Sequence, residues 1–375
     1  MTGRHALWDT LYDAWSSGRT SALATVVDTF GSAPRPIGSS MLLTPAGQVV
    51  GSVSGGCVEG DVLERARESV LDGTPQRATY GISDDDAFAV GLTCGGTLEV
   101  YVEPVDRDTF PGLGEVMESV RAGVPVAVVT VLEHRGSPPA GRHAVIHADG
   151  RDDGPCPPGL PAGVLDDARA LLRTGDSGLL HYASEDLSVF VRSLSPPPRM
   201  LLFGAGDFAA ALASVGRTLG YEVTVCDARP LFTTADRLPD ADEVVVARPD
   251  EYLAGEVARG RVDARTVVVS FTHDPKFDIP LLERALGLDV AFVGALGSRR
   301  THERRARALA GAGVSARALA RLSSPVGLDL GGRSPGETAV SIAAEIIAAR
   351  HGGGGERLSL RAGPVHLRPT AVSRG

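Results

Sequence analysis

The fold of this chain is indicated by residues 200–227, MLLFGAGDFAAALASVGRTLGYEVTVCD. An apolar strand precedes the turn Gly204-Ala-Gly206, a helical segment follows it, and Asp227 ends the next apolar strand. Gly204 permits the tight turn, Gly206 lets a pyrophosphate approach the helix N-terminus, and a carboxylate in the position of Asp227 accepts hydrogen bonds from a ribose. This pattern predicts the nucleotide-binding start of a Rossmann-type domain. The plainer interpretation is a structural crossover that binds nothing.

The sequence after this stretch predicts the rest of that domain. Apolar segments alternate with helical patterns, and strands that are apolar on both faces indicate a parallel sheet covered by helices on both sides. Ser334-Pro-Gly-Glu337 carries the residues of a capping box, which predicts a last helix that ends near Arg350. The predicted fold class is α/β, with a C-terminal Rossmann-type doubly wound parallel sheet at 200–351 and an N-terminal mixed α/β domain at 1–194.

The N-terminal domain contains the pattern of an internal duplication, at residues 20–105 and 124–184. Gly136-Ser137 echoes Gly31-Ser32, and the segment at 164–169 parallels the one at 62–67. Short strands and Gly-Ser turns also recur by chance, so both interpretations stay open. The second copy has prolines at 157 and 158 where the first has a glycine-cysteine turn, and prolines remove backbone donors. If the repeat is real, only the first copy keeps the chemistry.

Two further segments predict how the domains are joined and how the chain ends. Ser195-Pro-Pro-Pro198 favours extended geometry and predicts a linker at 195–199. The Gly- and Arg-rich stretch at 352–375 predicts a flexible tail.

Composition excludes several classes of protein. The formal net charge of −9 opposes non-specific binding of nucleic acid. No apolar run approaches the ~18 residues of a membrane span, and the first 15 residues lack the apolar core of a signal peptide. Four scattered cysteines fit free thiols in a reducing compartment better than a disulfide framework. We expect a cytoplasmic protein that binds neither nucleic acid nor membrane.

Two cysteines lie within glycine-rich turns of the N-terminal domain. Cys57 follows Gly55 and Gly56 in Ser54-Gly-Gly-Cys-Val-Glu59, and Cys94 precedes Gly95 and Gly96 in Gly91-Leu-Thr-Cys-Gly-Gly96. Unpaired N–H groups of such turns stabilise anions and lower the pKa of a thiol. The spacing is not that of a zinc site. The two cysteines either meet in one pocket or are small buried residues beside tight turns.

Two polar loops follow strands of the C-terminal domain. Thr272-His-Asp274 comes directly after an apolar strand, and ligands of α/β folds bind at the carboxyl ends of strands. His273 and Asp274 are therefore candidate catalytic residues, or else Asp274 bonds the local backbone and His273 is solvated. Ser298 and Arg299, in Gly297-Ser-Arg-Arg300, suit a phosphate or carboxylate, with a solvated basic face as the alternative.

In this order, the motifs resemble those of the XdhC/CoxI family of xanthine dehydrogenase accessory proteins. The resemblance spans most of the chain and adds two blocks to those above, Gly31-Ser-Ala-Pro-Arg-Pro36 and Pro325-Val-Gly-Leu-Asp329. It departs from the family at Asp207, where many members have His, and a carboxylate there opposes a phosphate on the glycine turn.

The resemblance implies a chaperone for molybdenum cofactor rather than a turnover enzyme. The implied protein binds the cofactor, as molybdopterin or a dinucleotide form of it, supports its sulfuration with a cysteine desulfurase, and delivers it to an apo molybdenum hydroxylase. Cys57 and Cys94 would then contact molybdenum or sulfur, and the glycine loops and Arg299 would hold phosphate. A homodimer is left open.

Two other functions remain open on the sequence. An NAD(P)-dependent oxidoreductase would use His273 as acid or base and Lys276 to polarise a carbonyl. A non-catalytic module would bind NAD without turnover. The absence of a dehydrogenase motif set argues against the oxidoreductase, which would also leave the cysteine-bearing domain without a role.

Overall fold

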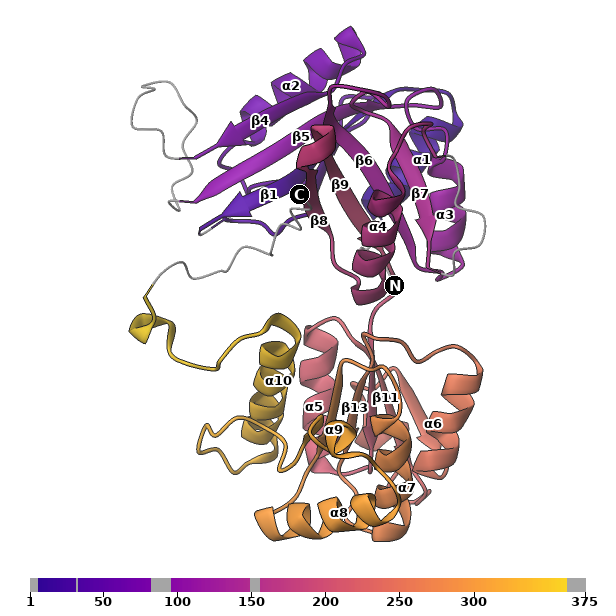
Figure 1. The fold of residues 1–375 in the computed structure, drawn as a ribbon, viewed down its shortest axis with the longest axis vertical. Helices are drawn as coiled ribbons and strands as arrows, with labels where there is room; N and C mark the ends of the chain where they lie inside the picture. Colours follow the sequence, from indigo (N-terminus) through magenta and orange to yellow (C-terminus); the bar gives the residue numbers. More distant parts are fainter. Residues whose placement is uncertain (1–5, 32, 82–95, 149–155, 363–375) are drawn as a thin grey trace. The chain divides into compact units, whose positions relative to one another are not determined.

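The computed structural model describes residues 6–31, 33–81, 96–148 and 156–362 of the chain. It divides into two compact units, of which unit 1 is Met1–Pro196 and unit 2 is Pro197–Arg361 (Figure 1). The Pro-rich stretch predicted as a linker lies between the last strand of unit 1, which ends at Leu194, and the first strand of unit 2, which begins at Arg199.

Unit 1 contains two antiparallel sheets with helices packed against them. The first sheet has the strand order β3-β2-β1-β5-β4 and the second has the order β7-β6-β9-β8. The strands are β1 (Ser21–Phe30), β2 (Ser40–Leu43), β3 (Val49–Gly51), β4 (Gln76–Tyr80), β5 (Thr97–Val105), β6 (Val126–His134), β7 (His143–His147), β8 (Gly178–Tyr182) and β9 (Leu187–Leu194). The helices are α1 (Ala6–Ser16), α2 (Glu59–Asp72), α3 (Leu113–Arg121), α4 (Ala162–Thr174) and a short 3-10 helix, η1 (Ala183–Glu185).

The two sheets of unit 1 repeat one design. In the second, two strands are followed by a helix that ends at a left-handed glycine, Gly175 after α4, and then by two more strands. The first has the same order, with Gly73 after α2, and one additional strand, β3, before the helix. The central pairs, β1 with β5 and β6 with β9, each contain one bulge, after Val26 and after Val131. The order β2-β1-β5-β4 within the first sheet thus corresponds to the order β7-β6-β9-β8 of the second, which is the arrangement that an internal duplication predicts; the second half extends to Leu194, beyond the predicted bound at residue 184.

Hydrophobic packing in unit 1 follows this duplication. One face of the first sheet packs on α2 through Val62 and Ala66, and one face of the second packs on α4 through Val164 and Ala168. Another cluster joins α1 and α3 to strands of both sheets. Apolar burial at ~25 cal/mol per Å² is the main force that holds these layers together.

Unit 2 is a doubly wound α/β fold, as predicted. Its six strands are parallel in the order β12-β11-β10-β13-β14-β15. The chain starts at β10 in the middle of the sheet, adds β11 and β12 on one side, and then adds β13, β14 and β15 on the other, so the strand order switches sides between β10 and β13. The strands are β10 (Arg199–Phe203), β11 (Glu222–Asp227), β12 (Glu243–Val246), β13 (Val267–Ser270), β14 (Phe292–Ala295) and β15 (Leu322–Ser323). Such a switch is the point at which ligands bind in this fold class.

Helices cover both faces of this sheet. Helices α5 and α10 pack on one face, while α6, α7 and α8 pack on the other (Figure 1). The bounds are α5 (Asp207–Thr218), η2 (Ala235–Arg237), α6 (Pro249–Ala258), α7 (Pro275–Leu286), α8 (Arg299–Gly311), α9 (Ala316–Leu319), α10 (Pro335–His351) and η3 (Leu358–Leu360). The predicted capping box is present at the start of α10, where Ser334 and Glu337 exchange hydrogen bonds.

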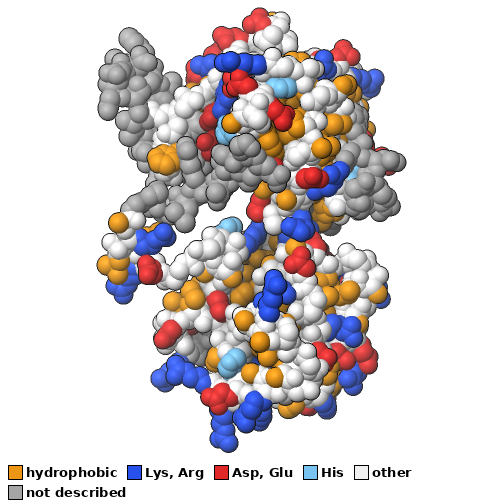
Figure 2. Space-filling view, viewed as in Figure 1, with side chains coloured by type: hydrophobic (Ala, Val, Ile, Leu, Met, Phe, Trp, Pro, Cys, Tyr) orange, Lys and Arg blue, Asp and Glu red, His pale blue; other side chains and the backbone are white. Residues whose placement is uncertain are grey.

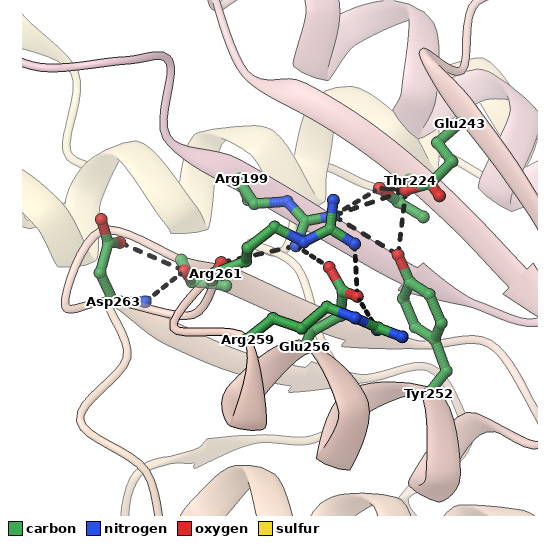
Figure 3. A network of polar contacts seen from close by, with 9 residues as sticks. Arg199, Thr224, Glu243, Tyr252, Glu256, Arg259, Arg261 and Asp263 are labelled. Carbon is green, nitrogen blue, oxygen red and sulfur yellow. Dashed lines mark hydrogen bonds and ion pairs between the residues drawn. The ribbon is translucent and has the colours of Figure 1, made fainter. Parts of the chain in front are cut away.

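A buried polar network fixes the first strand of unit 2 (Figure 3). The guanidinium of Arg199, at the start of β10, donates to the carboxylate of Glu256 on α6 and to the hydroxyl of Thr224 on β11. Glu256 is fully buried, and it also accepts from Arg259 and Arg261. Because the carboxylate is surrounded by three guanidinium groups, its burial is compensated by charge. The network ties the strand that follows the Pro-rich stretch to its neighbours.

Among the helices of the described residues, none has both the length and the apolar character needed to cross a lipid bilayer.

Candidate functional site

The glycine-cysteine turn of unit 1 connects β3 to α2. Gly55 and Gly56 have φ angles of 78° and 125°, a region that side-chain-bearing residues rarely adopt, so the turn requires glycine at both positions. Cys57 follows them and is exposed, while Val58 behind it is fully buried and anchors the turn in the core. The turn therefore presents the thiol at the surface on a defined backbone.

The N–H groups of this turn bond Glu59, the first residue of α2. Its Oε1 accepts from the N–H groups of Ser54 and Gly55, each at 2.9 Å, and its Oε2 accepts from Gly56 at 2.7 Å. The hydroxyls of Ser52 and Ser54 also donate to it. Burial raises the pKa of Glu59, but these hydrogen bonds outweigh it and lower the pKa to about 2.

This arrangement corrects one expectation. The sequence predicted unpaired N–H groups beside Cys57, whereas the N–H groups of residues 54, 55 and 56 are all paired with the carboxylate of Glu59. The local pattern hid this because a glutamate three residues after a glycine turn is an ordinary helix-start residue. The other predicted turn is only partly described: Cys94 and Gly95 lie outside the described residues, and Gly96 is buried directly before β5.

The second candidate site lies in unit 2, at the carboxyl ends of β10 and β13, between which the strand order switches sides. Gly204 ends β10 with a φ of 111°, and a Cβ there would lie 3.1 Å from the N–H nitrogen of Thr272, in the loop after β13. Gly206 is the N-cap of α5 with extended backbone, no side chain caps that helix, and a Cβ on Gly206 would meet nothing within 4 Å. Asp207 is exposed. The turn thus combines one tightly packed glycine with one that borders open space, as a phosphate-binding turn requires.

Asp227 has a different environment from the one the sequence predicted. Its Oδ2 accepts from the N–H of Ala205 at 2.7 Å, and both of its oxygens accept from the guanidinium of Arg229. Burial raises its pKa, and the hydrogen bonds from Arg229 and Ala205 outweigh this and lower it. The carboxylate therefore holds the glycine turn and the Arg229 side chain in place, and a ribose has to compete with Arg229 for its oxygens.

The loop after β13 is organised as a helix start. Asp274 is the N-cap of α7, accepts from the N–H of Lys276 at 3.1 Å and forms an ion pair with its ammonium at 3.2 Å. This backbone hydrogen bond is the main cause that lowers the pKa of Asp274. His273 is exposed beside it. The loop directly contacts the Gly204 turn, so both predicted blocks lie at one edge of the sheet.

The loop after β14 also begins a helix. The hydroxyl of Ser298 accepts from the N–H of Thr301 at 3.1 Å and so caps α8. Arg299 is exposed next to it, with Arg300 and Arg304 on the same helix. Figure 2 shows basic side chains at the lower end of unit 2, where α8 is labelled in Figure 1. The Ser298 hydroxyl is thus used by the cap, and the side chain of Arg299 is exposed beside it.

Sequence reasoning missed the buried pair that supports these loops. Arg305 of α8 donates from Nε to Oδ2 of Asp278 on α7 at 2.7 Å, and from its other nitrogens to Ser324 Oγ and the carbonyl of Leu296. Ser270, at the end of β13, donates to the same carboxylate. Arg305 lies within a run of exposed arginines, and its polar sequence neighbours give no sign of its burial. These contacts join the carboxyl ends of the strands at the site.

Within the ranges that the structure describes, no group of three or more His, Cys, Asp or Glu side chains could hold a metal ion. The two candidate sites are a turn that presents a thiol in unit 1 and the edge of the sheet beside Gly204 and Gly206 in unit 2.

Comparison with known proteins gives the relatives of both units. The model of the XdhC Rossmann domain matches residues 200–346, and the model of the XdhC and CoxI family matches residues 14–81 and 119–183. The two segments matched in unit 1 each overlap one of its two repeats. The family matches thus extend over the two units described above.

Individual relatives are similar over nearly the whole chain. A protein of Bacillus subtilis named as a probable xanthine dehydrogenase subunit is 30% identical over 352 residues, which are 93% of this chain and 98% of the relative. The molybdenum cofactor insertion chaperone PaoD of Escherichia coli is 26% identical over 90% of this chain and 86% of its own. A crystal structure described as a xanthine dehydrogenase from Bacillus halodurans has a TM-score of 0.65 and 26% identity, covering 95% of this chain and 98% of its own. With these matches in both units, the chain belongs to the XdhC and CoxI family.

Proposed function

We propose that this protein is a chaperone that binds molybdenum cofactor and inserts it into a molybdenum hydroxylase of the xanthine dehydrogenase type. The observation that carries the proposal is similarity to PaoD, named as a molybdenum cofactor insertion chaperone, over 90% of this chain. The similarity to the protein named as a xanthine dehydrogenase subunit supports the class of recipient. The cofactor is cargo in this account, so the protein has to bind it, protect it and release it.

In unit 1, Cys57 is the candidate contact to molybdenum or its sulfur. A thiolate is a soft ligand that suits a thiophilic metal, and Cys57 is exposed on a turn whose backbone is held by Glu59. A rigid turn reduces the entropy lost when the thiol engages its ligand. We assign the same role to Cys94 from its sequence motif alone. Support of sulfuration by a cysteine desulfurase would use the same exposed thiol.

In unit 2, the glycine turn is the candidate site for the phosphate of the cofactor. The N-terminus of α5 has no side-chain cap and borders open space at Gly206, which fits an anion held by backbone N–H groups and the helix dipole. Arg299, exposed at the start of α8, adds a cationic group from the same strand edge. His273 and Asp274, on the loop that touches this turn, would orient the bound group rather than transform it.

The environment of Asp227 disfavours NAD as the occupant of this turn. An NAD site of this fold uses the acidic residue to bind ribose hydroxyls, and here Arg229 takes up both oxygens of that carboxylate. The cationic Arg229 instead favours a ligand with a further negative charge close to the ribose, which leaves NADP as the nicotinamide alternative. Because the relative PaoD is named as a molybdenum cofactor insertion chaperone, we propose the dinucleotide form of molybdenum cofactor first and NADP second.

Reconstitution tests the proposal directly. The full-length protein, purified from a host that makes molybdenum cofactor, is added to an apo hydroxylase of the xanthine dehydrogenase type. We expect hydroxylase activity to appear in proportion to the molybdenum supplied with the chaperone, and heat-denatured chaperone with the same molybdenum content to give less. Equal activation by the denatured sample would show that the protein only carries a dissociable cofactor, and would contradict insertion. Gel filtration of the loaded protein tests whether the active form is a homodimer, and fractionation tests the cytoplasmic location.

A further inference from the structure

The two repeats of unit 1 place a negative and a positive residue at equivalent positions. Glu103 on β5 lies opposite Leu23 of β1, and Arg192 on β9 lies opposite Val128 of β6. Leu23 lies three residues before Val26, after which the bulge of the first repeat begins. Val128 likewise lies three residues before Val131, after which the bulge of the second repeat begins. The duplication therefore relates Glu103 to Arg192.

Arg192, from the second repeat, bonds the first repeat. Its guanidinium donates to the carbonyl of Gly38 at 2.7 Å, to Ser40 Oγ at 2.7 Å and to Thr25 Oγ1 at 3.1 Å. It also lies over the ring of Trp8, with 5.4 Å between the guanidinium carbon and the ring centroid. Arg192 is partly buried, and its guanidinium needs such acceptors because an uncompensated charge away from water is costly.

The equivalent residues of the second repeat are known from the same registers. Thr25 pairs with Ser40, and Thr130 pairs with His143, so His143 stands where the first repeat has Ser40. Arg192 bonds Ser40, so if the two charges are related by the duplication, Glu103 should lie next to His143. It does: Oε2 of Glu103 lies 3.1 Å from Nε2 of His143, with both side chains almost fully buried. Each charge thus reaches across to the other repeat.

A small cavity lies at this crossing. Its volume is about 10 Å³, and its lining includes Glu103, His143, Arg192 and the two equivalent threonines, Thr25 and Thr130. Although Glu103 Oε2 and His143 Nε2 are close, their geometry is not that of a hydrogen bond, and among the described residues neither atom has a hydrogen-bond partner. A polar cavity of ~10–15 Å³ accommodates one water molecule.

We propose that Glu103 and Arg192 form a crossed clasp that selects how the two repeats pair, and that one buried water completes the hydrogen bonds of Glu103 and His143. A mismatched pairing of the two sheets would leave the buried Glu103 and the partly buried Arg192 without these partners. The clasp thus adds specificity to an interface that also contains apolar, non-directional contacts, such as those of Val27 and Leu132. The inference does not depend on the proposed function.

A double-mutant cycle on the full-length protein tests the clasp. We expect Glu103→Gln and Arg192→Gln each to lower the urea midpoint of unit 1, and the double variant to lose clearly less than the sum of the two losses. Arg121→Gln, which removes an exposed ion pair with Asp9, is the control and should change the midpoint little. Additive losses, or losses no larger than that of the control, would overturn the proposal.

Charge exchange tests the equivalence of the two positions. Glu103→Arg and Arg192→Glu each place like charges together, and the combined exchange restores one charge of each sign. We expect the exchange to unfold at a higher urea concentration than either single reversal; an exchange no better than the worse single variant would contradict the equivalence. Should these variants fail to fold, Arg192→Lys, which keeps the charge, must retain more stability than Arg192→Gln. A crystal structure should show an ordered water within hydrogen-bond distance of Glu103 Oε2. If the cavity is instead empty or filled by protein atoms, the proposed buried water is refuted.

Discussion

Arg305 donates a hydrogen bond of 2.7 Å from Nε to Oδ2 of Asp278, and the two side chains are 2% and 7% exposed. The pair joins α8 to α7, the two helices that begin with the loops of the candidate phosphate site. Ser270 and Ser324 extend it to the ends of two strands. The geometry of the site therefore depends on a charge pair that faces the interior of unit 2 rather than the ligand.

Breaking this pair should destabilise unit 2. Arg305→Met leaves the Asp278 carboxylate buried without its cation, a change that costs about 3–5 kcal/mol. Urea denaturation followed by the far-ultraviolet signal measures the loss. Arg304→Met, one position earlier and exposed, should cost less than about 0.5 kcal/mol. Equal losses for the two variants would show that the pair does not stabilise the fold.

The two glycines of the Rossmann turn should respond differently to alanine. Gly204→Ala puts a Cβ 3.1 Å from the Thr272 nitrogen at a φ of 111° and should cost about 1–3 kcal/mol of stability. Gly206→Ala places its Cβ in open space on extended backbone, so stability should be unchanged while phosphate-containing ligands bind at least about tenfold more weakly. Thermal unfolding and ligand titration measure the two effects. Unimpaired binding by Gly206→Ala would remove the turn from the site.

The pKa of Glu59 predicts how the cysteine turn responds to acid. Because folding lowers this pKa to about 2, the carboxylate stabilises the turn fully above its unfolded pKa of ~4.3, and this contribution is lost as pH falls from there towards 2. Hydrogen exchange of residues 54–58 should therefore accelerate over that range beyond its intrinsic pH dependence. Glu59→Gln should show fast exchange at all pH values, whereas Glu64→Gln, exposed on the same helix, should behave as wild type.

The same variant probes the thiol. In Glu59→Gln the turn loses its anion, so its N–H groups become available to the Cys57 thiolate. We expect alkylation of Cys57 at pH 7 to be faster than in wild type, because backbone N–H groups stabilise the thiolate that reacts. An unchanged rate together with faster amide exchange would show that Glu59 orders the backbone without influencing the cysteine.

The network at Glu256 predicts acid sensitivity of unit 2. Burial raises the pKa of this carboxylate, and hydrogen bonds from Arg261 and Arg199 outweigh this and lower it. Its stabilisation is present above the unfolded pKa of ~4.3 and is lost as pH falls through the lower folded value. Glu256→Gln should cost about 3 kcal/mol at pH 7 and make stability less dependent on pH below 5. Glu251→Gln, exposed on the same helix, is the matched control.

Short-range patterns predicted much of this molecule. The Gly204 turn, the parallel sheet and the capping box of α10 each depend on residues close together in the chain, where backbone sterics and hydrophobic periodicity act. The duplication was visible as a repeated order of turns and strands, although the equivalence of Glu103 and Arg192 required the strand registers.

What the sequence did not predict are the partners of polar side chains. The turn at 54–56 could be recognised as a source of N–H groups, but not that Glu59 accepts from them. Asp227 could be placed at a strand end, but not its contact with Arg229. Arg305 and Asp278 pair across two helices, and no local period encodes such a contact. Side-chain direction at the site is therefore a tertiary property.

The cofactor content of the purified protein tests the central claim most directly. Full-length protein and Cys57→Ala are purified from a host that makes molybdenum cofactor, and oxidised-pterin fluorescence and molybdenum are measured per chain. We predict pterin and molybdenum together in the wild-type protein and a loss of at least about tenfold in Cys57→Ala, with circular dichroism unchanged and Cys156→Ala, another exposed cysteine, as the control. Wild-type protein that carries neither pterin nor molybdenum would contradict the chaperone function, and equal pterin in wild type and Cys57→Ala would contradict the role of Cys57.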